Sequence, residues 1–529
     1  MLQTPKATRG IVVAPHHLAS QAGLRVLREG GNAIEAMVAA AATVTVVYPH
    51  MNALGGDNFW LLSDGRDTPV GIDACGAAAA AADVDLYRRQ GLDAIPSRGP
   101  LAANTIAGAV SGWQRALEVS ARWGGGLSLS RLLEDAIHYA REGVPVTGAQ
   151  HADTVAKRAE LAEVPGFAET FLVAGEVPPV GALFKQPALA RTLEALAKAG
   201  FDDFYRGDVA RAIAAELERV GSPVSAEDLA RHHSREVAPL KVTLQSGTVY
   251  NLPPPTQGLT SLMTLALFER LGCWEPEGFD HIHGLIEATK CAFKVRDAHV
   301  TDPAYMDVDP ASFLTDAALD DMVVAIDSAK AAPWLPGESA GNTVWLGAID
   351  GAGCAVSFIQ SLYWEFGSGV VLRDTGITWQ NRGVSFSLAE GAVNVLKPGR
   401  KPFHTIQPPL ALLGDGRVMA YGTMGGEGQP QTQAAIFTRH VTFGQQLQAA
   451  VTAPRWLLGR TWGARTAYLR LENRFAAEVV DALIEAGHDL ELVGAFDPVM
   501  GHAGAVVRHP GGLIEGAADP RGDGVVAAF

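Results

Sequence analysis

Clustered apolar positions predict a β-hairpin about two-thirds of the way along the chain. Residues 343–350 form a run of β-branched, aromatic and aliphatic side chains, a Gly-Ala-Gly turn follows at 351–353, and a second apolar run returns over 354–359. The preceding segment, residues 331–342, contains prolines, glycines and a serine, which is typical of an exposed loop. The pattern therefore places Thr343 at the first residue of a strand that follows a loop.

Longer apolar patterns predict helices on both sides of this hairpin. Residues 36–48 are almost wholly apolar, and the run is shorter than the roughly 20 residues of a membrane span, so we expect a buried helix. Residues 20–29 form an amphipathic pattern that ends at Gly30, and Asn32 is expected to cap the next helix. Other predicted helices are 107–120, 127–143, 187–199, 209–220 and 281–297, and predicted strands include 59–62, 70–74 and two pieces within 242–252.

Composition is that of a globular protein with ample core, since 48% of residues are hydrophobic and 19% are charged. The formal net charge is −15, which favours neither a nucleic acid nor an anionic membrane as a partner. A small anionic substrate would therefore need a local basic group.

Four scattered cysteines, at positions 75, 273, 291 and 354, suit neither a disulfide framework nor a cysteine-based metal site, and we expect reduced thiols. The first ten residues lack the apolar core of a secretory signal, so a cytoplasmic location is expected.

A glycine-rich turn is predicted where the apolar run from Val418 ends. Gly422, Gly425, Gly426 and Gly428 precede a helix expected from Gln431. Such a turn can hold a phosphate at a helix N-terminus, but it lacks the Lys-Ser/Thr of a phosphate-binding loop and the spacing of a dinucleotide fingerprint. Nucleotide binding is left open as an alternative.

Three stretches resemble the γ-glutamyltranspeptidase family of N-terminal nucleophile hydrolases: T-V-W-L-G-A-I-D from Thr343, F-G-S-G from Phe366 and T-G-I-T-W-Q-N-R-G-V-S-F-S-L from Thr375. Further similarity runs from near residue 10 to the C-terminus. The resemblance implies an α+β fold, a four-layer αββα sandwich. It also implies autocatalytic cleavage between Asn342 and Thr343, which would give a large subunit, 1–342, and a small subunit, 343–529, that together build one domain.

The resemblance also implies the catalytic residues. Thr343 would supply a hydroxyl nucleophile and, after cleavage, its own α-amine as the general base. Ser361 stands where the family has a threonine that holds this amine, and Gly425 and Gly426 would offer backbone N–H groups to the oxyanion. Val344 replaces the family's second threonine, so maturation is itself in question. Neither a metal ion nor an organic cofactor is implied.

The positions that bind substrate depart from the family pattern. Cys75 replaces the arginine for the substrate α-carboxylate, and a neutral thiol cannot act as a bidentate guanidinium. Ser385 replaces the aspartate for the α-ammonium, while Arg382 stands in place of a glutamine, so the local preference changes from a zwitterion to a plain anion. At the remaining positions, Tyr363 replaces an asparagine of the family, and His404 and Thr405 replace two adjacent serines.

Three of these residues keep a second interpretation. Arg382 would bind substrate or form a surface ion pair. Tyr363 would narrow the pocket and donate a hydrogen bond, or pack on Phe366. His404 would titrate near neutrality and tune the substrate's charge, or serve as a hydrogen-bonded structural histidine.

The leading hypothesis is an autoprocessing amidohydrolase for a small substrate with one carboxylate and no amine, similar to the branch of oxamate amidohydrolases and cephalosporin (glutaryl) acylases. Alternatives are a γ-glutamyl hydrolase or transferase acting on glutathione, a nucleotide-binding protein, and an unprocessed, inactive scaffold. The expected partners are a small amide and the two subunits of one precursor, with a dimer of such heterodimers left open; nucleic acid and membrane are not expected.

Overall fold

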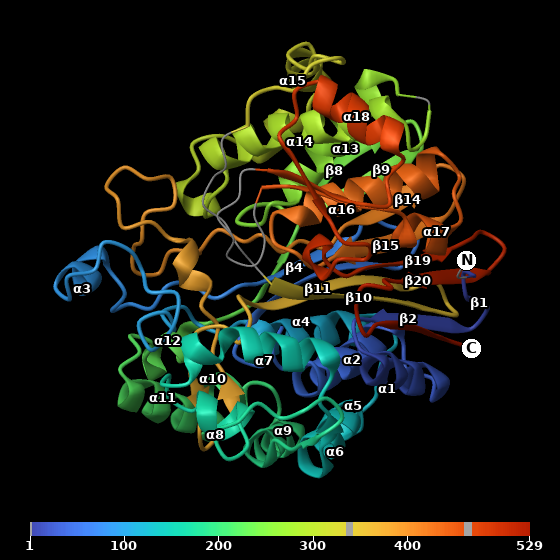
Figure 1. Ribbon diagram of the computed structural model, residues 1–529. Coiled ribbons are helices and arrows are strands. Elements are labelled where there is room, and N and C mark those ends of the chain that lie inside the picture. The colour runs from blue at the N-terminus through green and yellow to red at the C-terminus, as the bar shows by residue number, and fades with distance from the viewer. Residues whose placement is uncertain (1–2, 274, 335–341, 460–467) are drawn as a thin grey trace.

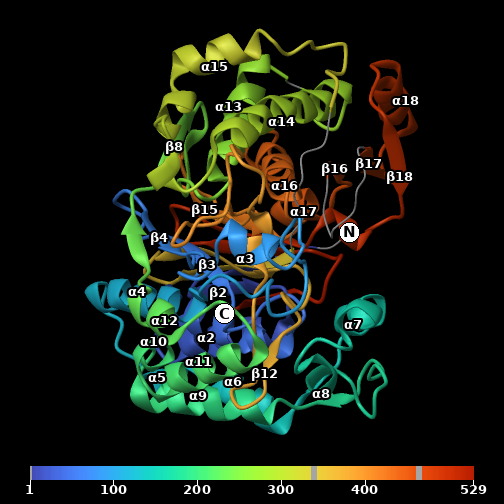
Figure 2. The same cartoon turned by 90° about the vertical axis from the view of Figure 1, so that its left-hand side faces the viewer.

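The computed structural model of the protein describes residues 3–273, 275–334, 342–459 and 468–529. Two seven-stranded sheets stack in the middle of the molecule, and helices cover the outer face of each (Figure 1). The view turned by 90° shows the same succession, with α13, α14 and α16 on one side of the sheets and α2, α9 and α11 on the other (Figure 2). These layers form the αββα sandwich that the sequence predicts, so the predicted fold class is confirmed.

Each sheet is antiparallel throughout and combines strands from both sides of residue 342. The first sheet has the order β21 (Val525–Ala528), β2 (Gly10–Ala14), β10 (Asn342–Asp350), β11 (Ala355–Tyr363), β3 (Asp57–Ser63), β4 (Val70–Ala74) and β7 (Arg235–Val237). The second has the order β1 (Lys6–Ala7), β20 (Ile514–Ala518), β19 (Ala503–Arg508), β15 (Val418–Thr423), β14 (Leu410–Leu413), β9 (Gly247–Asn251) and β8 (Leu240–Leu244).

The helices of the layer over the first sheet come from the N-terminal half. They are α1 (His17–Arg28), α2 (Ala33–Val47), α4 (Ala109–Arg122), α5 (Leu129–Leu132), α6 (Glu134–Glu142), α7 (Gly148–Leu161), α8 (Phe167–Phe171), α9 (Pro187–Ala199), α10 (Asp203–Arg206), α11 (Asp208–Val220) and α12 (Ala226–Arg231), with α3 (Val84–Arg88) to one side. The other layer holds α13 (Gly258–Leu271), α14 (Phe279–His299), α15 (Asp316–Val323), α16 (Gly428–Phe437), α17 (Leu447–Thr452) and α18 (Ala477–Glu485). Small sheets join β5 (Val144–Pro145) to β6 (Leu183–Phe184), β12 (Val371–Leu372) to β13 (Ile377–Thr378), and β16 (Trp456–Leu458), β17 (Leu469–Glu472) and β18 (Leu490–Val493) to one another.

Alternation along β10 decides which way its side chains face. Val344 and Leu346 belong to the apolar core that contains α2, whereas Trp345 and Ile349 belong to the core that also holds residues of the second sheet. Successive strand residues point to opposite faces, so Thr343 faces the space between the sheets. Val344, which stands in place of the family's second threonine, is buried in the helix-facing core instead.

The predicted buried helix at 36–48 is α2, and Asn32 caps it in a capping box with Glu35. The structure contains no helix, among the residues it describes, that is long and apolar enough to cross a membrane. The single helix predicted at 127–143 is wrong: α5 ends at Leu132 and α6 begins at Glu134, where two acidic residues favour a new helix N-terminus. Helix α13 was missed because it is apolar on every side and shows no helical period.

Candidate active site

The site is built on the open end of the β10–β11 hairpin. Between the pairs Asn342↔Tyr363 and Val344↔Gln360 the register shifts, so Thr343 lies opposite two residues of β11. The Thr343 hydroxyl is buried and donates to Ser361 Oγ at 3.3 Å, and Ser361 Oγ also accepts from the Tyr363 amide at 2.8 Å. The structure therefore brings the predicted nucleophile and its predicted holding residue together. Most of the loop predicted before Thr343 lies outside the described residues.

The glycine-rich turn approaches from the second sheet, where β15 packs against β10 and β11. Its strand ends at Thr423 and α16 begins at Gly428, with φ of +116° at Gly425 and +53° at Gly426. Such positive φ values favour glycine, most strongly at Gly425, whose φ lies beyond the left-handed helical region. Within the described chain the N–H groups of Gly425 and Gly426 donate no hydrogen bond, so both are available to an oxyanion.

One buried side chain that sequence analysis missed braces this turn. The Gln257 amide donates from Nε2 to the carbonyl of Gly426 at 2.9 Å and to that of Thr405 at 2.6 Å. Its Oε1 accepts from Arg296 at 3.2 Å, and Arg296 also donates to Glu427 at 3.0 Å. Gln257 thus ties the glycine turn to the loop that carries His404 and Thr405. A polar residue two positions after the Pro253–Pro255 run was the available signal.

Arg382 is the cation of the site. Its side chain is buried, its guanidinium carbon lies 3.8 Å from the centroid of the Tyr363 ring, and none of its three nitrogens has a hydrogen-bond partner among the described residues. Burial lowers the pKa of Arg382 to about 10, so the group is charged at neutral pH. The surface ion pair considered for Arg382 is therefore wrong. Phe366 packs on Phe167 and Phe171, while Tyr363 presents its ring to Arg382.

Asp57, the first residue of β3, was also missed. Its Oδ1 accepts from the amides of Gly76 at 3.0 Å and Gly108 at 2.9 Å, and its Oδ2 lies 3.3 Å from Nε2 of His404. Burial raises the pKa of Asp57 to about 7. An apolar strand that begins with a carboxylate, directly after Gly56, whose missing Cβ lets the chain approach Ser361, was the signal in the sequence.

His404 does not titrate near neutrality, which corrects one of its two interpretations. Burial and the positive charges of Arg382 and Lys401 hold its pKa well below the usual 6.5, so the ring is neutral. The other interpretation is corrected too, because neither ring nitrogen has a hydrogen-bond partner in the described part of the chain.

Cys75 and Ser385 differ in how they join the site. The Cys75 thiol is buried and its pKa is raised by burial, so it is neutral, and it lies near enough to Arg382 for a thiolate there to raise the pKa of the guanidinium. Ser385 ends the short 3-10 helix Arg382–Ser385, and its Oγ has no hydrogen-bond partner among the described residues. Its side chain therefore makes no hydrogen bond to the other predicted site residues in this part of the chain.

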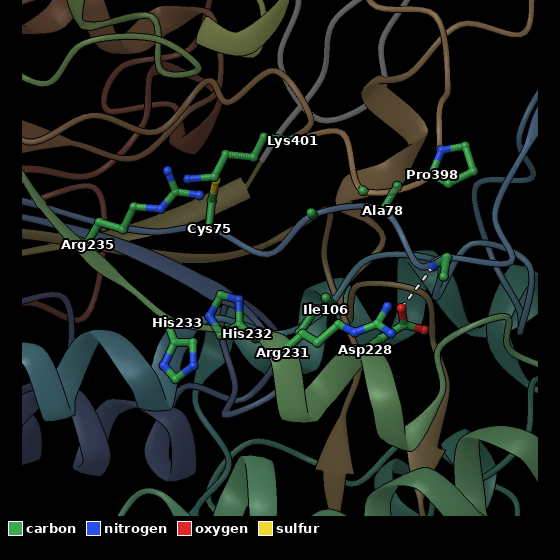
Figure 3. A pocket seen from close by; sticks show the side chains of 13 residues that line it. Cys75, Ala78, Ile106, Asp228, Arg231, His232, His233, Arg235, Pro398 and Lys401 are labelled. Atoms are coloured by element: carbon green, nitrogen blue, oxygen red, sulfur yellow. Dashed lines mark hydrogen bonds between the residues drawn. The ribbon is translucent and has the colours of Figure 1, made fainter.

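Beyond Cys75 lies a cavity of about 510 Å³. Figure 3 shows Lys401 and Arg235 reaching toward the Cys75 sulfur, with Arg231 and Asp228 further along the wall. Lys401 forms an ion pair with Asp73, two residues before Cys75. Cys75 therefore forms a wall shared by the acyl side of the site and this basic cavity.

A separate group, His283, Glu287 and His488, has the residue types of a metal site. However, His283 Nδ1 lies 2.9 Å from His488 Nε2, and Lys290 donates to Glu287 at 2.7 Å. Glu287 also accepts from the Ala332 amide at 3.1 Å. These contacts engage the donor atoms within the protein and fix the chain at Ala332, so the group is accounted for without an ion.

Comparison with known proteins identifies the family to which a chain with this site belongs. The sequence profile described as Gamma-glutamyltranspeptidase matches residues 19–529. The chain belongs to the γ-glutamyltranspeptidase family. It is 54% identical over 524 residues to the oxamate amidohydrolase proenzyme of Klebsiella pneumoniae subsp. pneumoniae, covering 99% of both chains, and 42% identical to the glutathione hydrolase-like YwrD proenzyme of Bacillus subtilis, again covering 99% of both.

Among solved structures, a cephalosporin acylase from Bacillus halodurans matches with a TM-score of 0.92 and 33% identity, covering 100% of this chain and 97% of that one. The family, its N-terminal nucleophile fold and the amidohydrolase class predicted from the sequence are thus confirmed. Membership in this γ-glutamyltranspeptidase family replaces the nucleotide-binding and scaffold interpretations.

Proposed function

We propose that this family member hydrolyses the amide of a small monocarboxylate of the oxamate type. The observation that carries the proposal is Arg382, a buried charged guanidinium whose three nitrogens have no hydrogen-bond partner among the described residues. A carboxylate is the complement of such a group, because it accepts two parallel hydrogen bonds. The relative named an oxamate amidohydrolase, at 54% identity, supports this choice of acyl group.

Cleavage between Asn342 and Thr343 would free the α-amine of Thr343 and leave fragments 1–342 and 343–529 associated through both sheets. The amine takes the hydroxyl proton as Thr343 Oγ1 attacks the amide carbonyl, and Gly425 and Gly426 stabilise the oxyanion through their N–H groups. The protonated amine then gives this proton to the amide nitrogen as the C–N bond breaks, and ammonia leaves. Water hydrolyses the acyl-threonine ester and regenerates Oγ1, giving a dicarboxylate and ammonia from amide and water.

The intact mass of purified protein, measured beside Thr343→Ala, tests the nucleophile. We expect masses for 1–342 and 343–529 in the wild type and one uncut chain in the variant, with ammonia released from oxamate only by the wild type. Thr343→Ser is the matched control that keeps a hydroxyl and should retain cleavage. An uncut wild-type chain that still hydrolyses oxamate contradicts the N-terminal mechanism.

Arg382→Lys and Arg382→Gln test recognition of the carboxylate. Hydrogen bonds to charged groups contribute about 1.5–3 kcal/mol, so KM for oxamate should rise about 10- to 100-fold while cleavage into fragments stays complete. An unchanged KM in Arg382→Gln would remove Arg382 from substrate binding.

Hydrolysis of γ-glutamyl substrates is the second candidate, favoured by the 42% identical relative whose name contains glutathione hydrolase. Ser385 argues against it, since a hydroxyl cannot neutralise the α-ammonium that an aspartate would bind. Rates with glutathione and with its analogue lacking the α-amine separate the two. Faster turnover of glutathione would favour this second candidate.

A further inference from the structure

We propose that Asp57 balances the charge of Arg382 and takes up a proton from solvent when a substrate carboxylate binds there. The inference rests on the proposed function, because it requires Arg382 to be the carboxylate site. Asp57, on β3, would thus act in substrate recognition without taking part in the bond changes of the reaction.

The position of Asp57 suits this role. The side chain is fully buried, and the amides of Gly76 and Gly108 hold Oδ1, so the carboxyl group cannot turn away. The other oxygen, Oδ2, has no hydrogen-bond partner among the described residues and lies 3.3 Å from His404 Nε2. Oδ2 can therefore gain or lose a proton without breaking a hydrogen bond within the described residues.

The charges around Asp57 come from several elements. Arg382, on the segment after β13, lowers the pKa of Asp57, and the charge of Asp57 raises that of Arg382. The Gln380 side chain is engaged elsewhere, because its Nε2 donates to the Ile106 carbonyl at 2.8 Å. His404, Cys75 and Tyr205 are neutral at pH 7, since burial lowers the pKa of His404 and raises those of Cys75 and Tyr205. Further out, the charge of Lys401 is paired with that of Asp73.

This arrangement makes binding of an anion and protonation of Asp57 interdependent. Ionised Asp57 and charged Arg382 sum to zero, and a substrate carboxylate would add a second negative charge inside a buried site. Like charges at such a site favour protonation of one of them. Because burial has already raised the pKa of Asp57 to about 7, the proton is taken up near physiological pH and is released when the product leaves.

The state of Asp57 also affects specificity. Protonated Asp57 offers no negative charge to an α-ammonium group, whereas ionised Asp57 does. Monocarboxylates should therefore bind better as pH falls toward 7, and an amine-bearing glutamyl substrate should show the opposite dependence.

The binding of propionate, an unreactive monocarboxylate, measures how carboxylate affinity depends on pH without turnover. We expect its Kd, from NMR line broadening between pH 6 and 9, to be constant below about pH 7 and to rise about tenfold per unit above it. Asp57→Asn keeps an oxygen for both glycine amides and should give a Kd that does not change with pH. Asp153→Asn is the matched control, because burial also raises the pKa of Asp153 to about 7, and it should behave as wild type.

A pH dependence that survives in Asp57→Asn overturns the inference, as does a wild-type Kd that is flat across the range. If Asp57→Asn fails to fold, the wild type alone decides: in weakly buffered solution at pH 8, about one proton should be taken up per propionate bound. Absence of uptake overturns the inference. The proposed function fails separately, when Arg382→Gln binds propionate as tightly as the wild type.

Discussion

Tyr363 and Arg382, nineteen positions apart, are stacked: the guanidinium carbon lies 3.8 Å from the centroid of the phenol ring. Tyr363 reaches this position from a left-handed backbone conformation, with φ of +80°. A bulky residue in that region costs of order 1–3 kcal/mol and persists where the surrounding structure fixes it. The ring is thus held in place as a flat surface on which the guanidinium stacks.

Replacing Tyr363 with leucine should raise KM for oxamate. The loss of a buried cation–π contact, about 0.5–2 kcal/mol, corresponds to roughly 2- to 30-fold weaker binding. Tyr363→Phe keeps the ring and is the control, expected to stay close to wild type. Steady-state kinetics on fully cleaved protein measure both. Equal losses in the two variants would show that the hydroxyl, and not the ring face, matters.

Alanine at the two turn glycines should lower kcat unequally. Gly425 has a φ of +116°, which alanine avoids, so Gly425→Ala should displace the oxyanion donors and cost about 10²–10³ in kcat. Gly426, at +53°, lies in the left-handed helical region that other residues visit, so Gly426→Ala should lose less. The rate of ammonia release, measured in samples quenched at fixed times and divided by the amount of cleaved protein, gives kcat. A larger loss at Gly426 would contradict this order.

Gln257→Leu should reduce kcat with little change in KM. The substitution removes two hydrogen bonds that hold the carbonyls of Gly426 and Thr405, worth about 0.5–1.5 kcal/mol each, so kcat should fall by about 5- to 150-fold. A merely structural role would lower the melting temperature and leave kcat per folded molecule unchanged. Thermal melts beside the kinetics distinguish these results.

Buried neutral histidines should make the fold less stable in mild acid. Burial lowers the pKa values of His50, His232 and His281 from 6.5 to about 3. The unfolded chain takes up these protons first, so each contributes stability above pH 6.5 that is lost, at about 1.4 kcal/mol per pH unit, as pH falls toward 3. Asp57 and Asp153, whose pKa values are raised to about 7, act in the opposite sense between pH 7 and 3.8.

His281→Gln isolates one such contribution. Chemical unfolding at pH 6.5 and 5.5 should show a smaller loss of stability in the variant, by about 1 kcal/mol, than in the wild type. His138→Gln, at an exposed position, is the control and should keep the wild-type loss. The assignment fails if both variants lose stability equally.

Local patterns were enough for the hairpin, the buried helix α2 and the glycine turn. Apolar runs and turn residues act over a few positions, so Thr343 could be placed at the start of a strand, and Asn32 at a cap, without knowledge of the fold. The family motifs added Ser361, Gly425 and Gly426 as members of one site. Alternation along β10 then carried Thr343 to the face between the sheets.

The sequence by itself determined the hairpin, the capped helix and the glycine turn through short-range patterns, and the fold class and family through motifs that resemble a known family. Only the tertiary structure decided the charges of the acyl site. Asp57 lies more than three hundred positions before Arg382 and His404 in the chain. The protonation state of each of the three depends on its burial and on nearby charged groups. The role of Gln257 also depends on the tertiary structure. Its hydrogen-bond acceptors are carbonyls of loops far away in the sequence, which no local pattern brings together.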